Sequence, residues 1–126
     1  NAWANGVIIC GSAGNGDANG IGQNWARYPA SYDNVVSSAA TTSTDLKTTF
    51  SNFHSTVDVS SPGQSILSTY YDNTYNSLDG TSMSSPITAG TVALLWAKYP
   101  SWTPQQIVDK LKLGVDSIYN LNPTYV

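Results

Sequence analysis

The sequence has few of the residues from which several kinds of functional site are built. Its 126 residues include one cysteine, one histidine, one methionine and five lysines and arginines together. A single cysteine cannot form an intrachain disulfide, and the position of Cys10 in the apolar run VIIC favours a small buried side chain over a reactive thiol. Five basic residues and a net charge of −3 exclude the basic surface that nucleic-acid binding requires.

Long apolar runs are also absent. The run VALLWA (92–97) is cut off by Lys98, far short of the roughly 20 residues that cross a bilayer, and no signal peptide opens the chain. Charged residues make up only 10% of the sequence, whereas serine, threonine, asparagine, glycine and tyrosine are abundant. This composition is met more often outside the cell than in the cytosol. We therefore expect a secreted or extracellular protein that has neither nucleic acid nor membrane as a partner.

What is present is a chain of single-domain size with alternating element types. At 40% hydrophobic residues it can bury a core. Short β-branched runs predict three strands, VIIC (7–10), NVVSSAATT (34–42) and TVDVSS (56–61). A helix is predicted over 84–99, and a second one begins at the capping box TPQQ (103–106) and ends at Gly114. Strands followed by helices predict an α/β fold with a parallel sheet.

The segment GTSMSSP (80–86) has two interpretations. In the first, Ser84 and Ser85 are helix N-caps, and Pro86 occupies the first turn, where its missing N–H is not needed. In the second, a serine at the helix start is a nucleophile, because the exposed amides and the positive end of the helix dipole stabilise an oxyanion. The local sequence leaves both interpretations open.

Three motifs in order resemble the subtilisin-like serine proteases. GTSMSSPITAG (80–90) is similar to their active-site serine segment, which implies that Ser82 is the nucleophile. CGSAGNGD (10–17) is similar to their strand-end segment, which implies that the side-chain amide of Asn15 donates to the oxyanion. FSNFHSTVDVSSPGQSILST (50–69) resembles the stretch that leads into the serine segment, and NPTYV (122–126) the part before the last helix.

The resemblance implies a serine endopeptidase that hydrolyses peptide bonds through an acyl-enzyme. The fold implied is a partial subtilisin-like α/β domain, with a parallel sheet flanked by helices and incomplete at both ends. We expect residues 1–126 to be the C-terminal portion of a single peptidase domain, whose N-terminal part, on the same or a separate chain, is a partner.

The sequence departs from the family at the other two members of the catalytic triad. The D-[ST]-G and H-G-T motifs that carry the aspartate and the histidine do not occur here. His54 stands where the family has a loop residue, and PITAG (86–90) stands where the family more usually has PHVAG. We expect the triad Asp and His outside this chain and the fragment alone to be inactive. Two alternatives stay open: a non-catalytic pseudoprotease or binding module, and one chain of a split or cleaved protease.

Substrate-binding and cofactor residues are implied by the same resemblance. Ser12, Ala13 and Gly14 match backbone that lines one wall of the specificity pocket for a protein or peptide substrate. Arg27 matches a position at the base of that pocket, although a solvated loop arginine fits the sequence equally well. GDANG (16–20) has too few carboxylates for a calcium loop, so we expect no metal or other cofactor in this segment. The resemblance allows calcium elsewhere in the complete domain.

Overall fold

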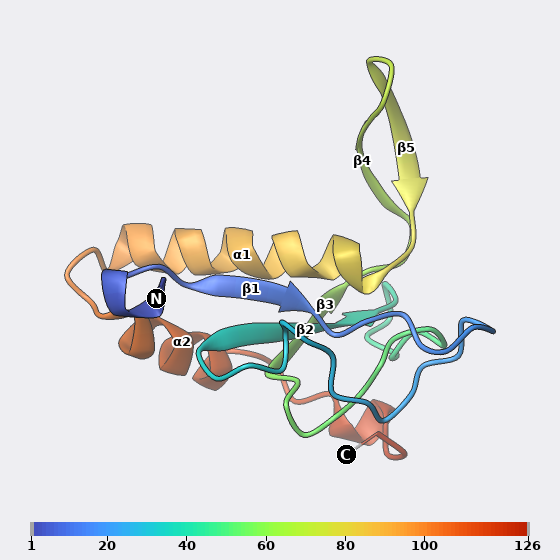
Figure 1. Cartoon of the computed structure of the whole chain (residues 1–126), viewed down its shortest axis with the longest axis horizontal. Coiled ribbons are helices and arrows are strands. Elements are labelled where there is room, and N and C mark those ends of the chain that lie inside the picture. The colour runs from blue at the N-terminus through green and yellow to red at the C-terminus, as the bar shows by residue number, and fades with distance from the viewer. Residues whose placement is uncertain (1, 126) are drawn as a thin grey trace.

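A parallel sheet of three strands forms the centre of the protein. The computed structural model describes residues 2–125, so Asn1 and Val126, the two ends of the predicted domain, lie outside it. The strands β1 (Ile9–Ser12), β2 (Val35–Thr41) and β3 (Val59–Pro62) lie in the order β1-β2-β3. All neighbours in this sheet are parallel (Figure 1). The predicted α/β fold with a parallel sheet is confirmed.

The strands begin later than the sequence predicts. β1 was predicted over 7–10, but Val7 is exposed and the pairing continues through Gly11 and Ser12, which lie opposite Ser37 and Ser38 of β2. Glycine is needed at this position of the strand because another segment passes too close to leave room for a side chain. A Cβ at Gly11 would lie 2.9 Å from the Cα of Ala30. Gly11, which the local sequence places after the end of the strand, therefore takes part in the pairing with β2.

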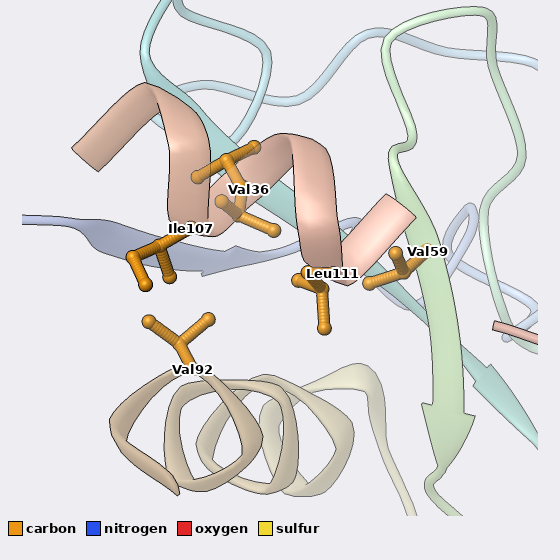
Figure 2. Close-up of a cluster of buried hydrophobic side chains, with 6 residues drawn as sticks. Val36, Val59, Val92, Ile107 and Leu111 are labelled. Carbon is orange, nitrogen blue, oxygen red and sulfur yellow. The ribbon is translucent and has the colours of Figure 1, made fainter. Parts of the chain in front are cut away.

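Two helices contribute to one apolar cluster with the sheet. α1 (Thr81–Lys98) and α2 (Pro104–Leu113) both supply buried side chains to it. Figure 2 shows this cluster, in which Ile107 of α2 and Val36 of β2 are 0% and 1% exposed. Burial of aliphatic side chains is the main favourable term in folding, so this cluster fixes the helices on the sheet. Its six buried members are Val36, Val59, Val92, Ile107, Val108 and Leu111.

The first helix begins three residues before the predicted start. Its N-cap is Gly80, so Ser84 and Ser85 lie inside the helix, and the prediction that they cap it is wrong. Pro86 likewise lies inside the helix, in its second turn rather than its first. The first amide of the helix, that of Thr81, donates to Oδ1 of Asn15 at 2.9 Å. The cap comes from a segment 66 residues away, and no local pattern could reveal it.

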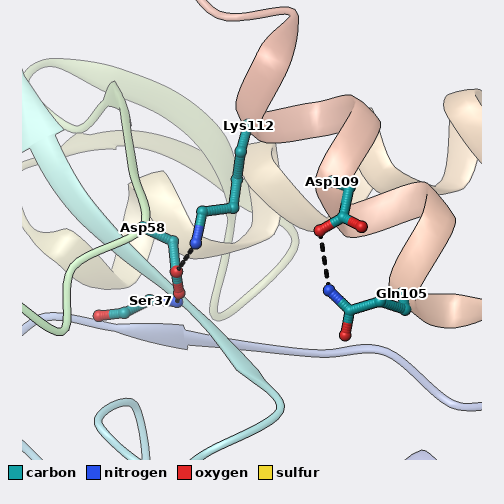
Figure 3. A network of polar contacts seen from close by, with 5 residues as sticks. All are labelled: Ser37, Asp58, Gln105, Asp109 and Lys112. Carbon is teal, nitrogen blue, oxygen red and sulfur yellow. Dashed lines mark hydrogen bonds and ion pairs between the residues drawn. The ribbon is translucent and has the colours of Figure 1, made fainter.

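The second helix begins at the predicted capping box. The Gln106 amide donates to Thr103 Oγ1 at 3.3 Å, and the Thr103 amide donates to Gln106 Oε1 at 2.9 Å. At the other end, Lys112 pairs with Asp58 at 2.6 Å, and Asp58 also accepts from the Ser37 amide at 2.8 Å (Figure 3). These contacts tie α2 to the beginning of β3 and to β2.

A hairpin that the sequence did not predict projects from the body of the molecule. Strands β4 (Ile66–Tyr70) and β5 (Thr74–Leu78) pair antiparallel and pack mainly on each other. Asp72 and Asn73 at its tip have φ of 57° and 56°, the left-handed conformation that Asp and Asn adopt in tight hairpin turns. Figure 1 shows the hairpin standing away from the sheet beside the start of α1. It leads through Asp79 directly into the helix that carries Ser82.

Candidate active site

Ser82 lies in the first turn of α1, beside the carboxyl end of β1. Its side chain is exposed, and it lines a cavity of about 370 Å³ together with Ser12 of β1. The loop segment 28–30 also lines this cavity. Backbone amides in the first turn of a helix have no intrahelical acceptor, and the dipole places partial positive charge there. The site therefore combines an exposed hydroxyl with a positive environment at the mouth of a cavity.

Asn15 is held against the start of the same helix. Its Oδ1 accepts from the Thr81 amide at 2.9 Å and from Thr81 Oγ1 at 2.8 Å. Because both partners donate, this atom is the oxygen of the side-chain amide, and the nitrogen is turned the other way. A Cβ at Gly80 would lie 3.1 Å from Nδ2 of Asn15 and 3.6 Å from the Ser82 amide nitrogen. The side-chain nitrogen of Asn15 and the backbone nitrogen of Ser82 thus both lie close to Gly80.

Thr81 joins the two segments and was not singled out in the sequence. Its side chain is 1% exposed and, besides donating to Asn15, accepts from the Gly14 amide at 3.1 Å. One hydroxyl therefore fixes both the loop after β1 and the side chain of Asn15. A polar residue next to Ser82 was the only signal in the sequence that could have suggested it.

The three predicted pocket residues differ in their surroundings. Ser12 lines the cavity. Ala13 is 3% exposed, and its backbone is engaged within the protein, with the amide donating to the Ser38 carbonyl at 3.0 Å and the carbonyl accepting from Asn52 Nδ2 at 3.1 Å. The Gly14 carbonyl accepts from the Asn52 amide at 2.9 Å. Of the three, Ser12 is the one that the structure brings together with Ser82.

Arg27 crosses the loop that carries Asn15. Its guanidinium donates to the Gly16 carbonyl at 3.0 Å, and its Cγ packs against Gly14, where a Cβ would lie 2.9 Å away. The guanidinium carbon also lies 5.2 Å from the ring centre of Trp25. Arg27 is not one of the cavity-lining residues, although Tyr28, which follows it, is one. In this structure Arg27 contacts the loop of the predicted oxyanion donor rather than the cavity.

His54 lies in the loop before β3 and does not line the Ser82 cavity. Its Nδ1 accepts from the Thr56 amide at 3.3 Å and lies 3.0 Å from Thr56 Oγ1. Thr56 Oγ1 continues to Ser31 Oγ at 2.8 Å. This histidine therefore takes part in a contact between two loops, in agreement with its interpretation as a loop residue.

Two further side chains that could be reactive or bind an ion lie near the site, the thiol of Cys10 and the carboxylate of Asp17. Cys10 lines the cavity and packs against the apolar cluster, and burial raises the pKa of its thiol. Asp17 accepts from the Asn19 amide at 2.8 Å and the Ile21 amide at 3.2 Å through Oδ1, and from Gln23 Nε2 at 3.1 Å through Oδ2. Both carboxylate oxygens thus accept hydrogen bonds from within the loop. Residues 2–125 hold no group of three or more His, Cys, Asp or Glu side chains that could bind a metal.

The protein is an α/β protein with an exposed serine in the first turn of a helix, next to an asparagine side chain that follows a parallel strand, and these are elements that serine acyl-transfer sites use. The comparison with protein families agrees with this class. Residues 1–116 match the model of the subtilase family, so the chain belongs to that family.

Similar proteins of the family cover most of this chain. Subtilisin DY from Bacillus licheniformis is 42% identical over 110 residues, which are 87% of this chain and 40% of that protein. Subtilisin BL from Lederbergia lenta is 37% identical over 121 residues, which are 96% of this chain and 43% of that protein. A solved structure of proteases from Pseudoalteromonas arctica matches with a TM-score of 0.83 at 29% identity, over 91% of this chain and 38% of the other. The chain thus spans about two fifths of the length of these relatives.

Proposed function

We propose that residues 1–126 are the C-terminal portion of the catalytic domain of a secreted subtilisin-like serine endopeptidase. In the reaction, Ser82 Oγ attacks the carbonyl of a peptide or protein substrate and forms an acyl-enzyme, which water then hydrolyses. The Asn15 side-chain amide and the Ser82 backbone amide donate to the oxyanion that develops on the carbonyl. The histidine that accepts the serine proton, and the aspartate that orients it, come from the part of the domain outside this chain.

The observation that carries the proposal is the position of Asn15. Its carbonyl oxygen is bound to Thr81, which leaves Nδ2 close to Gly80, to which the Ser82 amide is also close. An asparagine that served only as a turn residue would have no reason to bind the start of a helix 66 residues away. The cavity beside Ser82, with Ser12 in one wall, supports a place for the substrate side chain.

The partner with which this chain completes its site is proposed to be the N-terminal part of the same domain. β1 pairs only with β2 in the part of the chain that the structure describes, so its other edge presents free backbone groups. Among the residues at and before the start of β1, Val7 and Ile9 are 49% and 40% exposed, and Leu94 of α1 is 75% exposed. Parallel sheets are normally covered on both faces and extended by further strands, which supports the docking of more of the domain here.

The localisation and the partner classes rest on composition and on relatives. The relatives are subtilisins, and the low content of charged residues is typical of extracellular proteins. Among residues 2–125, no helix is both long enough and apolar enough to cross a membrane. We propose secretion, a protein or peptide substrate, and no role for nucleic acid or membrane. No cofactor is proposed for this segment, and calcium is proposed only for other parts of the domain.

Labelling with a fluorophosphonate tests the role of Ser82. In the complete domain the probe should attach to Ser82 alone, because only an activated serine with oxyanion donors reacts with it. Mass spectrometry of the labelled peptide identifies the residue, and Ser82→Ala should abolish labelling. Ser85→Ala is the matched control, since Ser85 lines the same cavity, and it should be labelled like the parent. Label on Ser84 or Ser85 would overturn the assignment.

The second candidate is a pseudoprotease that binds peptides without cleaving them. The observation in its favour is that His54, the one histidine of the sequence, contacts Thr56 and does not line the Ser82 cavity. A complete domain that binds peptides and is inert to the probe would support it.

The substitution Arg27→Gly tests the two interpretations of that arginine. A changed cleavage profile on a peptide library would show that Arg27 contributes to the specificity pocket, and an unchanged profile would show that it is a loop arginine.

A further inference from the structure

Four hydroxyl side chains meet beneath the helix that carries Ser82. Ser38 of β2, Ser61 of β3, and Ser84 and Thr88 of α1 form this hydroxyl cluster. Ser38 Oγ lies 2.8 Å from Thr88 Oγ1, 3.0 Å from Ser61 Oγ and 3.2 Å from Ser84 Oγ, and Ser61 Oγ lies 2.6 Å from Thr88 Oγ1. Ser38 and Ser84 are 0% exposed, and Thr88 is 3% exposed.

Every hydroxyl proton in the cluster has an acceptor. Ser84 Oγ donates to the Ala39 carbonyl of β2 at 2.9 Å, and Ser61 Oγ donates to the Ser84 carbonyl of α1 at 3.1 Å. Ser38 Oγ can then donate to Thr88 Oγ1 at 2.8 Å, and Thr88 Oγ1 can donate to Ser61 Oγ at 2.6 Å. The network therefore runs from the backbone of β2, through the side chains, to the backbone of the helix. Buried networks that are fully satisfied rigidify the segments that they join.

The helix needs such support at this point. Pro86 has no N–H, so the carbonyl of Ser82, four residues earlier, lacks its usual donor within the helix. The first-turn amides also lack intrahelical acceptors. The turn that carries Ser82 is thus weakly held by its own hydrogen-bond ladder. The cluster begins in the next turn, and Ser84 Oγ also reaches back to within 3.3 Å of the Thr81 carbonyl.

Hydroxyl groups are an unusual choice for this interface if packing alone were required. Apolar side chains could fill the same space without the cost of removing four hydroxyls from water. Directional bonds add a fixed register, because a shift of the helix along the sheet would break several of them together. The hydrogen bonds of the cluster therefore fix the position of the helix along the sheet, which an apolar contact would not do.

We propose that the hydroxyl cluster positions Ser82, by fixing the start of α1 on β2 and β3. The inference rests on the proposed function of Ser82 and deepens it. The four residues are positioning residues, since none of them touches the substrate or donates to the oxyanion. Their effect is on the distance and orientation of Ser82 Oγ relative to the attacked carbonyl, to which rates of acyl transfer are sensitive.

The test compares Thr88→Val, which keeps the side-chain shape and removes the hydroxyl, with Thr88→Ser, which keeps the hydroxyl. Thr91→Val is the control, because Thr91 lies on the same helix but is exposed, and its hydroxyl donates to the Ile87 carbonyl at 3.0 Å. In the complete domain, Thr88→Val should slow both the labelling of Ser82 and kcat by about 10- to 100-fold, the range for a misplaced reacting group. KM should change little, because the cavity walls are untouched. Thr88→Ser and Thr91→Val should behave like the parent.

Amide hydrogen exchange of residues 81–85 provides a readout that does not depend on activity. Exchange there should be faster in Thr88→Val than in Thr88→Ser if the cluster fixes the helix start. If Thr88→Val melts at a lower temperature but labels Ser82 at the parental rate and leaves exchange unchanged, the cluster is only structural support and the proposal is wrong. If the parent itself is not labelled, the proposed function fails, and the exchange comparison still decides the inference. Should Thr88→Val not fold, Ser61→Ala, at a less buried position, gives the same comparison.

Discussion

At the scale of single residues, Thr81 shows how one side chain can orient another for which a chemical role is proposed. Its hydroxyl donates to Asn15 Oδ1 and accepts from the Gly14 amide, and its own amide also donates to Asn15. The orientation of the proposed oxyanion donor therefore depends on Thr81. A substitution of Thr81 that removes the hydroxyl breaks its bond to Asn15 and leaves the bond from the backbone amide in place.

Thr81→Val should lower kcat of the complete domain about tenfold and leave KM within about twofold. Removing an oxyanion donor outright costs about 10²–10³ in kcat in subtilisin, a relative of this chain, and loosening the donor should cost less. Steady-state kinetics on a peptide substrate measures the effect, with Thr81→Ser as the control that keeps the hydroxyl. An unchanged kcat in Thr81→Val would mean that the backbone bond alone holds Asn15.

Sequence motifs alone could place Asn15 at the end of a strand and Ser82 at the start of a helix. They could not show that Asn15 caps this helix, because the bond joins residues 66 positions apart. The predicted caps Ser84 and Ser85 were wrong for the same reason: the local pattern offered two serines, and the true first amide finds its acceptor elsewhere. The cavity wall from segment 28–30 likewise depends on how a loop folds across the sheet.

At the scale of elements, predictions were most accurate where all the determining contacts are local. The capping box of α2 lies within four consecutive residues, and the structure has it as predicted. Strand bounds were less accurate, since the end of β1 depends on its pairing with β2 and on the passage of Ala30 over Gly11. The β4–β5 hairpin was missed because its strands are exposed and lack an alternating apolar pattern.

Thr103→Ala should destabilise the protein by about 1 kcal/mol, because it removes the side-chain acceptor for the Gln106 amide. The free energy of unfolding in urea is the quantity to measure, in the complete domain. Ser101→Ala, an exposed position just before the helix, is the control and should change the stability by less than about 0.5 kcal/mol. Equal effects of the two substitutions would show that the capping box contributes nothing.

At the scale of the whole molecule, the free edge of β1 distinguishes this chain from a closed domain. Val7 and Ile9, just before and at the start of β1, are exposed, and the relatives extend well beyond the matched region. If the proposed N-terminal part docks there, the backbone groups of β1 become paired on both sides. The sheet would then be stabilised by assembly rather than by these residues alone.

Supplying the N-terminal part in trans should slow the amide exchange of Ile9–Ser12 and confer peptidase activity on an otherwise inert chain. The reason is that the triad histidine and aspartate and the missing strand arrive together. Mixing the two parts and measuring both exchange and hydrolysis tests this, with Ser82→Ala as a control that should gain protection without activity. Activity of residues 1–126 alone would contradict the expectation that the triad is completed from outside.

If the complete domain is the proposed peptidase, the projecting hairpin has a consequence for its lifetime. Its tip, around Asp72 and Asn73, is exposed and supported mainly by its own two strands, which makes it a preferred place for cleavage of the backbone. A peptidase stored at high concentration is its own most abundant substrate, so we expect autolysis to begin between Tyr70 and Thr74. Mass spectrometry of the stored enzyme should detect this nick before others, and shortening the hairpin should prolong activity. Since β5 leads into the helix of Ser82, a nick here would cut the chain between the proposed nucleophile and the strands β1 to β4.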